Sequence, residues 1–305
     1  MIDFILFILG SVLIFYGSSL LIDNSTLIAR SLNISPIVIG LTVIAFGTSL
    51  PELVVSIIAI LRGEGAIVLG NIVGSNIANI LLVLGLIVII KPIDINFPSL
   101  KQGSIYLLIA TFCLMIMILN QQLDYIAGSV LLILFCIYMI SQFKSTKDND
   151  LDASLPNEDF NFLYILYIIT GSLVLGYGSH LFINSSIQIA SFFNVPKLVI
   201  SVSLVAFGTS VPELVTSIVA VRKGEPNFVI GNIIGSNIIN IFLVLGSSLI
   251  ISDIYVTFLG IFYPFIFMVI SALLLLLFLL LNDKMNRNHG SLLFILYITF
   301  IYLTL

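Results

Sequence analysis

Residues 42–85 read TVIAFGTSLPELVVSIIAILRGEGAIVLGNIVGSNIANILLVLG, and residues 203–246 repeat this stretch as SLVAFGTSVPELVTSIVAVRKGEPNFVIGNIIGSNIINIFLVLG. About 28 of the 44 aligned positions are identical, at a constant offset of 161 residues that relates Glu52 to Glu213. Nearly all the glycines and polar residues are retained, whereas a helix buried in lipid exchanges Leu, Ile and Val freely. We therefore expect the chemistry of the protein to lie in this repeat.

The composition of the chain is that of an integral membrane protein. Hydrophobic residues make up 60% of the 305 positions, charged residues only 9%, and the mean hydropathy is +1.24. A soluble core cannot hide this much apolar surface. The apolar runs are continuous rather than alternating, which excludes a β-barrel. The predicted fold class is all-α.

Ten apolar runs are long enough to count as membrane spans, because a bilayer core of about 30 Å takes roughly 20 helical residues. The runs cover residues 4–22, 36–61, 66–90, 103–119, 125–143, 160–183, 198–221, 228–251, 254–281 and 291–305. We therefore expect ten transmembrane helices.

The basic residues predict the orientation of the chain in the cell membrane. If the N-terminus is outside, the outer loops contain only Arg62 and Lys197. The inner loops then contain Arg30, Lys91, Lys101, Lys144, Lys147, Arg222, Lys223, Lys284 and Arg287. This excess of positive charge on the inner side predicts a multi-pass protein with both termini extracellular.

The same count predicts that the two copies of the repeat are inverted. The first copy begins with a helix that enters from outside, and the second begins after an odd number of spans. We expect a five-helix repeat over residues 1–143, a cytoplasmic linker over 144–159, and an inverted five-helix repeat over 160–305. In such architectures the substrate site lies at mid-membrane, where the halves meet.

A proline interrupts one span in each copy of the repeat. Pro51 and Pro212 each remove a backbone hydrogen bond and crowd the carbonyl group four residues earlier, at Gly47 and Gly208. Irregular backbone at membrane depth is tolerated only inside protein or along a polar cavity. The carbonyl groups expected to face such a cavity are those near Ala45, Gly47, Ala206 and Gly208.

Polar oxygens gather on one face of the helices in each copy. Thr48 and Ser49 precede Glu52 by four and three residues, which places the three side chains on one side of the helix. The remaining oxygen-bearing residues follow the same spacing: Thr209, Ser210 and Glu213, then Ser75 with Asn79, and Ser236 with Asn240. A carboxylate at mid-bilayer costs roughly 2.5 to 3.5 kcal/mol, so a symmetric pair indicates function.

Carboxylate, amide, hydroxyl and carbonyl oxygens favour hard cations, and nearby Cys or His ligands for softer metals are absent from the motif. A mixed, flexible set of ligands favours Ca²⁺ over Mg²⁺, and Na⁺ also suits the neutral oxygens. Two carboxylates balance one Ca²⁺ or two Na⁺ in a low-dielectric cavity. Competition for the same two charges predicts exchange of the two ions.

GTSLPEL and GTSVPEL resemble the first half of the α-repeats of the cation/calcium exchanger superfamily, and GNIVGSNIANI and GNIIGSNIINI resemble the second half. The similarity is to its archaeal and bacterial sodium/calcium exchangers and covers the whole chain. It implies a ten-helix inverted-repeat fold that expels Ca²⁺ by alternating access, driven by Na⁺ entry.

The resemblance also implies ligands. The calcium site would comprise Glu52, Glu213, Thr48 and Thr209, with Asn79 and Asn240 completing the centre. One sodium site would use Ala206, Thr209, Ser210, Ser75 and Glu52, and its mirror image would use Ala45, Thr48, Ser49, Ser236 and Glu213.

Position 240 departs from the family pattern. The archaeal exchangers carry an aspartate there, opposite the asparagine of the first repeat, whereas this chain has Asn79 and Asn240. An amide has the shape and polarity of a protonated acid but carries no charge. The departure leaves the site at most two negative charges, which either weakens Ca²⁺ binding or alters the ion stoichiometry without implying loss of transport.

Two other functions remain open at this point. A Ca²⁺/H⁺ antiporter would use the same buried glutamates, although the duplicated neutral hydroxyls favour Na⁺. A passive cation channel would use the same oxygens as a filter. Catalytic motifs such as HExxH are absent, so the chain is not expected to be an enzyme or to need a cofactor. The expected partners are Ca²⁺, Na⁺ (with H⁺ as the alternative) and the lipid bilayer, without nucleic acid or an obligatory protein.

Overall fold

The computed structural model describes residues 2–121, 123–145, 159–193, 206–255 and 258–304, and these are almost entirely helical. The first half comprises α1 (Ile2–Leu32), α2 (Pro36–Ile39), η1 (Gly40–Ile44), α3 (Ala45–Thr48), α4 (Leu50–Leu61), α5 (Gly65–Ile77), η2 (Ala78–Leu84), α6 (Gly85–Ile90), α7 (Phe97–Asn120) and α8 (Tyr125–Ser145). The second half comprises α9 (Leu163–Phe192), α11 (Ala206–Thr209), α12 (Val211–Arg222), α13 (Asn227–Ile239), η4 (Asn240–Leu245), α14 (Gly246–Ile251), α15 (Phe258–Leu281) and α16 (Arg287–Thr304).

Seven helices in the described part are long and apolar enough to cross a membrane. An eighth span results if residues 36–48 and 50–61, which meet at an angle of 43°, are counted together. The expected span at 198–221 begins outside the described residues, and the one at 291–305 lies in α16, which is not among the seven. The structure is thus a multi-pass helical membrane protein, and the count of ten spans stays a prediction.

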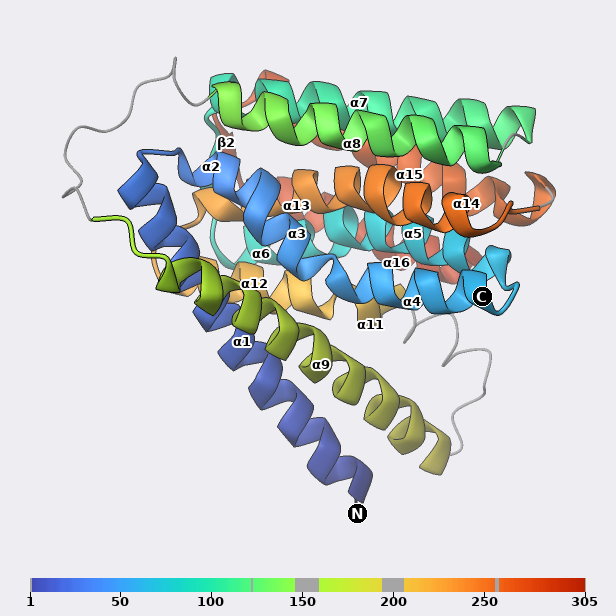
Figure 1. Ribbon diagram of the computed structural model, residues 1–305, viewed down its shortest axis with the longest axis horizontal. Coiled ribbons are helices and arrows are strands. Elements are labelled where there is room, and N and C mark those ends of the chain that lie inside the picture. Colours follow the sequence, from blue (N-terminus) through green and yellow to red (C-terminus); the bar gives the residue numbers. More distant parts are fainter. Residues whose placement is uncertain (1, 122, 146–158, 194–205, 256–257, 305) are drawn as a thin grey trace.

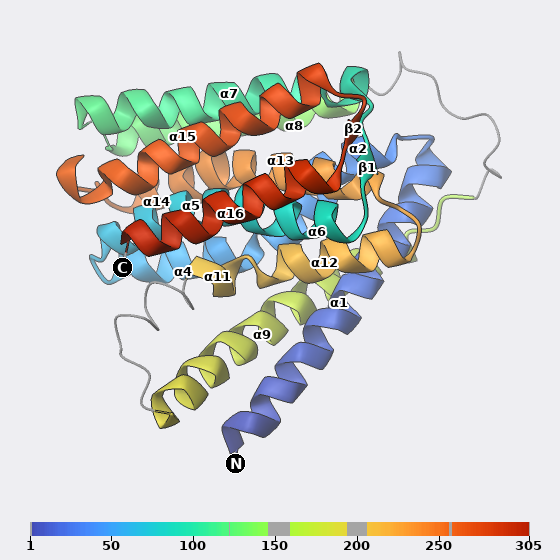
Figure 2. The ribbon, with the colours of Figure 1, turned by 180° about the vertical axis from the view of Figure 1, so that it is seen from behind.

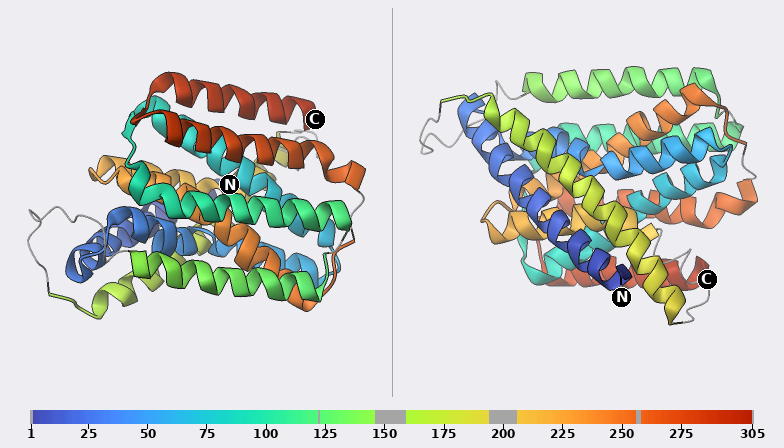
Figure 3. Two further views of the ribbon diagram at one scale, coloured as in Figure 1. Left: turned by 90° about the horizontal axis from the view of Figure 1, so that it is seen from above. Right: turned by 60° about the horizontal axis from the view of Figure 1, so that its bottom comes forward.

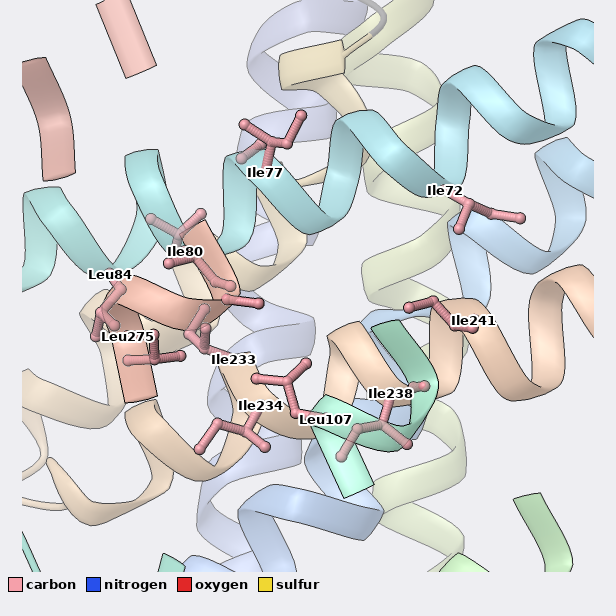
Figure 4. Packing of buried hydrophobic residues seen from close by; sticks show 14 of the residues in the cluster. Ile72, Ile77, Ile80, Leu84, Leu107, Ile233, Ile234, Ile238, Ile241 and Leu275 are labelled. Atoms are coloured by element: carbon pink, nitrogen blue, oxygen red, sulfur yellow. The ribbon is translucent and has the colours of Figure 1, made fainter. Parts of the chain in front are cut away.

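The central layer consists of the two helices that carry the second motif of each repeat. In α5 to α6, 89% of the most apolar window is buried inside the protein, and in α13 to α14 the fraction is 94%. Helices α7, α8, α15 and α16 lie outside them (Figures 1 and 2). Buried aliphatic side chains of both halves belong to one hydrophobic cluster, which includes Ile72, Ile77 and Ile80 of the first half and Ile233, Ile234 and Ile238 of the second (Figure 4).

Helices α1 and α9 form a tilted pair beside this centre and lie antiparallel along most of their length (Figures 1 and 3). Gly10 packs against Gly178, and Gly17 packs against Gly171. A Cβ atom at Gly17 would lie only 2.6 Å from the backbone nitrogen of Leu175, so glycine is required for this close approach.

The second half repeats the helix bounds of the first at the offset of 161 residues. Helix α12 begins and ends 161 residues after α4, and α15 begins and ends 161 residues after α7. The turns that follow α4 and α12 contain Gly63 with φ 77° and Gly224 with φ 82°, a left-handed conformation that favours glycine. A short antiparallel ladder pairs β1 (Ile93–Asp94) with β2 (Lys284–Met285) and joins the two halves.

The helix interruption expected from the prolines is present in both copies. Ser49 separates α3 from α4 with φ −83° and ψ 3°, and Ser210 separates α11 from α12 with φ −88° and ψ 2°. Pro51 and Pro212 then occupy the first turn of the new helix, where the missing N–H is tolerated. Within the described ranges, three π-helical segments, η1, η2 and η4, were not expected from the sequence and lie beside this region.

Candidate cation site

Each broken helix places its glutamate in the first turn after the break. Glu52 lies in the first turn of α4 and Glu213 in the first turn of α12. The free N–H groups and the positive end of the helix dipole favour a negative side chain at this position. The break therefore makes a buried carboxylate less unfavourable than it would be within a continuous helix.

Both glutamates are fully buried, with 0% of their surface exposed. The helices that carry them pack against the opposite half, since α4 contacts η4 and α12 contacts η2. Thr48 and Ser236 lie beside the Glu213 carboxyl group, yet none of the four carboxylate oxygens has a hydrogen bond of ordinary length and angle. The two acidic groups, one from each half, thus share one interior region without partners to satisfy them.

Hydroxyl and amide groups link the two halves around the carboxylates. The Thr48 hydroxyl donates to Asn232 Oδ1 at 3.1 Å and lies 3.2 Å from the Ser236 hydroxyl oxygen. Asn240 Nδ2 donates to Ser75 Oγ at 3.0 Å. In both cases a residue of the first half contacts a residue of the second.

Further oxygens of the expected ligands are buried without hydrogen-bond partners. In the described part of the chain, nine of the sixteen buried side-chain N and O atoms without a partner belong to the residues expected from the sequence. They are both carboxylate oxygens of Glu52 and of Glu213, the hydroxyl oxygens of Ser49, Thr209 and Ser210, and Oδ1 of Asn79 and Asn240. Buried polar groups are normally paired, so a cluster of unpaired oxygens indicates a ligand rich in positive charge.

The expected alanine ligands take part only through their backbone. The carbonyl oxygen of Ala45 accepts a hydrogen bond from Ser49 N at 3.0 Å and lies 3.3 Å from the Thr48 hydroxyl oxygen, so it is not the free carbonyl group expected from the proline break. Ala206 is the first residue of α11, and the residues before it lie outside the described part.

Two asparagines near the site, Asn71 and Asn232, are not among the residues expected from the sequence. Asn71 Nδ2 donates to the backbone carbonyl of Glu52 at 3.2 Å and to Ser56 Oγ at 3.0 Å. Its equivalent, Asn232, accepts the hydrogen bond from Thr48. The signal was present, because Asn71 lies one helical turn before Ser75 and both asparagines are identical in the repeat.

Among the residues that the structure describes, no group of three or more His, Cys, Asp and Glu side chains gathers in one place. Any cation held between Glu52 and Glu213 would therefore complete its coordination with neutral oxygens. This donor set suits Ca²⁺ or Na⁺ and is unlike the nitrogen and sulfur sites of zinc or copper.

Two known proteins are similar to this chain over nearly its whole length. The chain is 34% identical over 307 residues to the "Putative antiporter CaxA" of Alkalimonas amylolytica, covering 97% of this chain and 96% of the relative. It is 38% identical over 295 residues to the "Uncharacterized membrane protein MJ0091" of Methanocaldococcus jannaschii, covering 96% and 94%.

A solved structure with the same fold is that of the sodium-calcium exchanger NCX_Mj soaked with 2.5 mM Na⁺ and 0.1 mM Ca²⁺. It superposes with a TM-score of 0.85 at 36% identity and covers 99% of this chain and 98% of that one. The family profile described as "Sodium/calcium exchanger protein" matches residues 2–144 and again residues 163–305. Because the family profile covers both halves, the chain belongs to the sodium/calcium exchanger family.

Proposed function

We propose that this chain is a Na⁺-driven Ca²⁺ antiporter whose mid-membrane site is built on Glu52 and Glu213. The observation that carries the proposal is the pair of fully buried carboxylates, without hydrogen-bond partners, in a region of unpaired neutral oxygens. Ionised carboxylates are strongly unfavourable in such a place unless a cation accompanies them. The family membership and the similarity to the sodium-calcium exchanger NCX_Mj support the choice of Na⁺ and Ca²⁺.

Charge balance explains why the two ions would exchange. One Ca²⁺ or two Na⁺ neutralise two carboxylates, whereas both kinds of ion together would leave excess positive charge in a low-dielectric site. Occupation by Na⁺ therefore disfavours Ca²⁺. The neutral ligands would be Thr48, Thr209, Ser49, Ser210, Ser75, Ser236, Asn79 and Asn240, with the backbone of Ala45 and Ala206.

Access to the site would alternate between the two sides of the membrane by movement of two inverted halves, residues 1–143 and 160–305, each with five spans. The repeated helix bounds and the antiparallel packing of α1 against α9 support this architecture. The excess of basic residues on one side supports extracellular termini and a cytoplasmic linker over 144–159, of which residues 146–158 lie outside the described part.

The test is transport by the purified full chain in proteoliposomes. Vesicles loaded with Na⁺ and diluted into Na⁺-free buffer should take up radioactive Ca²⁺, and the Glu213→Gln variant should not. Glu64→Gln, which changes an exposed glutamate in the loop after α4, is the matched control and should transport normally. Uptake that a pH gradient drives equally well without Na⁺ would replace the proposal with Ca²⁺/H⁺ exchange. Uptake down the Ca²⁺ gradient that needs neither ion would indicate a channel.

A further inference from the structure

Two buried asparagines behind the proposed site make reciprocal contacts between the halves. Asn76 of α5 and Asn237 of α13 are equivalent in the repeat and are 2% and 1% exposed. Asn76 Nδ2 donates to the backbone carbonyl of Asn237 at 3.3 Å, and Asn237 Nδ2 donates to the backbone carbonyl of Asn76, also at 3.3 Å. Two hydrogen bonds thus link α5 of the first half to α13 of the second.

Each of these asparagines also holds an amide of the proposed site. Asn76 Oδ1 accepts a hydrogen bond from Asn240 Nδ2 at 3.2 Å, and Asn237 Oδ1 accepts one from Asn79 Nδ2 at 3.1 Å. Ser75 Oγ accepts a second hydrogen bond from Asn240 Nδ2. The site amide of one half is therefore held by an asparagine of the other half.

The hydrogen bonds fix which end of each site amide faces which way. A backbone carbonyl only accepts, so Asn76 must turn Nδ2 toward the carbonyl of Asn237 and Oδ1 toward Asn240. Asn240 must then present Nδ2 to Asn76, which leaves its Oδ1 buried and without a partner. The other half follows the same logic: Asn237 turns Nδ2 toward the carbonyl of Asn76 and Oδ1 toward Asn79. Asn79 therefore presents Nδ2 to Asn237, and its own Oδ1 is also unpaired.

We propose that Asn76 and Asn237 are positioning residues that make Asn240 and Asn79 present oxygen, and not the amide NH₂ group, to the transported cation. The inference rests on the proposed function of the same site. A reversed amide would place the positive end of its dipole against the cation and turn attraction into repulsion. Partners that orient metal ligands in this way typically contribute about ten- to a hundredfold to metal affinity.

The first test replaces the orienting side chain. Asn76→Leu should raise the apparent KM for Ca²⁺ in Na⁺-driven uptake about tenfold or more, and Asn237→Leu should do the same through Asn79. Asn24→Leu is the matched control, because Asn24 is a buried asparagine whose Nδ2 donates to the carbonyl of Leu20 in its own helix. Its KM should equal that of the wild type. Asn76→Ser also removes the hydrogen bond with Asn240 and is a smaller change in the buried core. Its KM for Ca²⁺ is the one to measure if Asn76→Leu does not fold.

A double-mutant cycle separates positioning from a purely structural contribution. If Asn76 acts through Asn240, then Asn76→Leu should add little to the KM of an Asn240→Ala variant, because the oxygen to be oriented is already missing. Multiplication of the two single effects would show independent contributions and would overturn the inference. Wild-type KM in Asn76→Leu and Asn237→Leu would also overturn it, while leaving the proposed function intact. Failure of the proposed function is distinguishable, since it appears as absence of Na⁺-driven uptake in the wild type.

Discussion

The two halves of the molecule match at the pair of asparagines between α5 and α13 and differ where α1 and α9 meet the broken helices. At the centre, Asn76 and Asn237 make the same contact at the same distance of 3.3 Å. At the end of α12, Lys223 forms an ion pair with Asp23 of α1. The position equivalent to Asp23 in the other half is Asn184, which contacts His180 of its own helix at 3.0 Å instead.

A buried hydrogen bond differs between the halves in the same way. The hydroxyl oxygens of Ser18 in α1 and Thr216 in α12 lie 3.0 Å apart and link the two helices. In the other half the counterpart of Ser18 is Ser179, which donates to the carbonyl of Leu175 in its own helix, and the counterpart of Thr216 is Val55. Helix α1 is therefore fastened to α12 by polar contacts for which α9 and α4 have no equivalent at these positions.

Two kinds of constraint act on the repeat. Ligand geometry demands the same oxygens from both halves, because the proposed site lies between them. The contacts at the ends are free to differ, and under the proposed alternating access these differences decide the relative energy of the two access states. Two identical inverted halves would populate both access states equally. A contact at the end of one broken helix that favours one state by only about 1 kcal/mol therefore changes the ratio of the two populations several-fold.

The largest expected effect tests the symmetry of the centre. Glu52→Gln and Glu213→Gln should each reduce Na⁺-driven Ca²⁺ uptake to background, since either change leaves a single carboxylate for a divalent ion. The double variant should be no worse than either single variant. Initial rates of uptake in proteoliposomes check this, and substantial uptake by one of the two single variants would show that the halves contribute unequally.

A large effect on stability is expected where α1 and α9 are in close contact. A Cβ atom at Gly17 or at Gly178 would lie within 2.6 Å or 2.8 Å of a backbone nitrogen of the opposite helix. Gly17→Val and Gly178→Val should therefore each destabilise the fold by about 1–3 kcal/mol through overpacking. Circular dichroism of the detergent-solubilised protein should show similar losses of melting temperature. Gly70→Ala is the control, because a Cβ atom there meets nothing within 4 Å.

A smaller effect is expected from the hydrogen bond that only one half has. Thr216→Val makes this position match Val55 and removes the link to Ser18, at a cost of about 1 kcal/mol. The state in which α1 contacts α12 should become less populated. The apparent KM for Ca²⁺ should then change in opposite directions on the two faces of the membrane, as measured in vesicles of opposite orientation. Equal changes on both faces would show that the contact does not discriminate between the access states.

The smallest effect is expected at the partly exposed ion pair. The side chains of Lys223 and Asp23 are 30% and 53% exposed, so their pairing is worth less than about 1 kcal/mol. Asp23→Asn should shift the two KM values in the same sense as Thr216→Val but less, and the shift should vanish at high salt. Asp94→Asn is the control, because it breaks the exposed pair with Lys284 in the ladder of β1 and β2, away from α1. It should leave the ratio of the two KM values unchanged.

The sequence predicted the membrane class and the broken helices, because each depends on local chemistry. It also predicted the residue pairs Thr48 with Ser236 and Ser75 with Asn240, which lie in contact at the candidate site. A proline in the interior of a helix interrupts that helix. The polar residues on one face of an otherwise apolar helix can be recognised from their spacing in the sequence. The π-helical segments η1, η2 and η4 were not predictable, since an extra residue per turn leaves no distinct pattern in these apolar runs. The orienting contacts of Asn76 and Asn237 were also out of reach, because they join residues of different halves.

By itself, the sequence determined that this protein is a helical membrane protein of two related halves, since apolar length and internal repetition are properties of the chain alone. Only the tertiary structure decided which oxygens stay unpaired and which residues orient the side-chain amides of Asn79 and Asn240. The physical reason is that hydrogen bonds between the halves depend on distance and direction in space: Asn240 and Asn76 are 164 positions apart in sequence, yet their side chains lie within 3.2 Å.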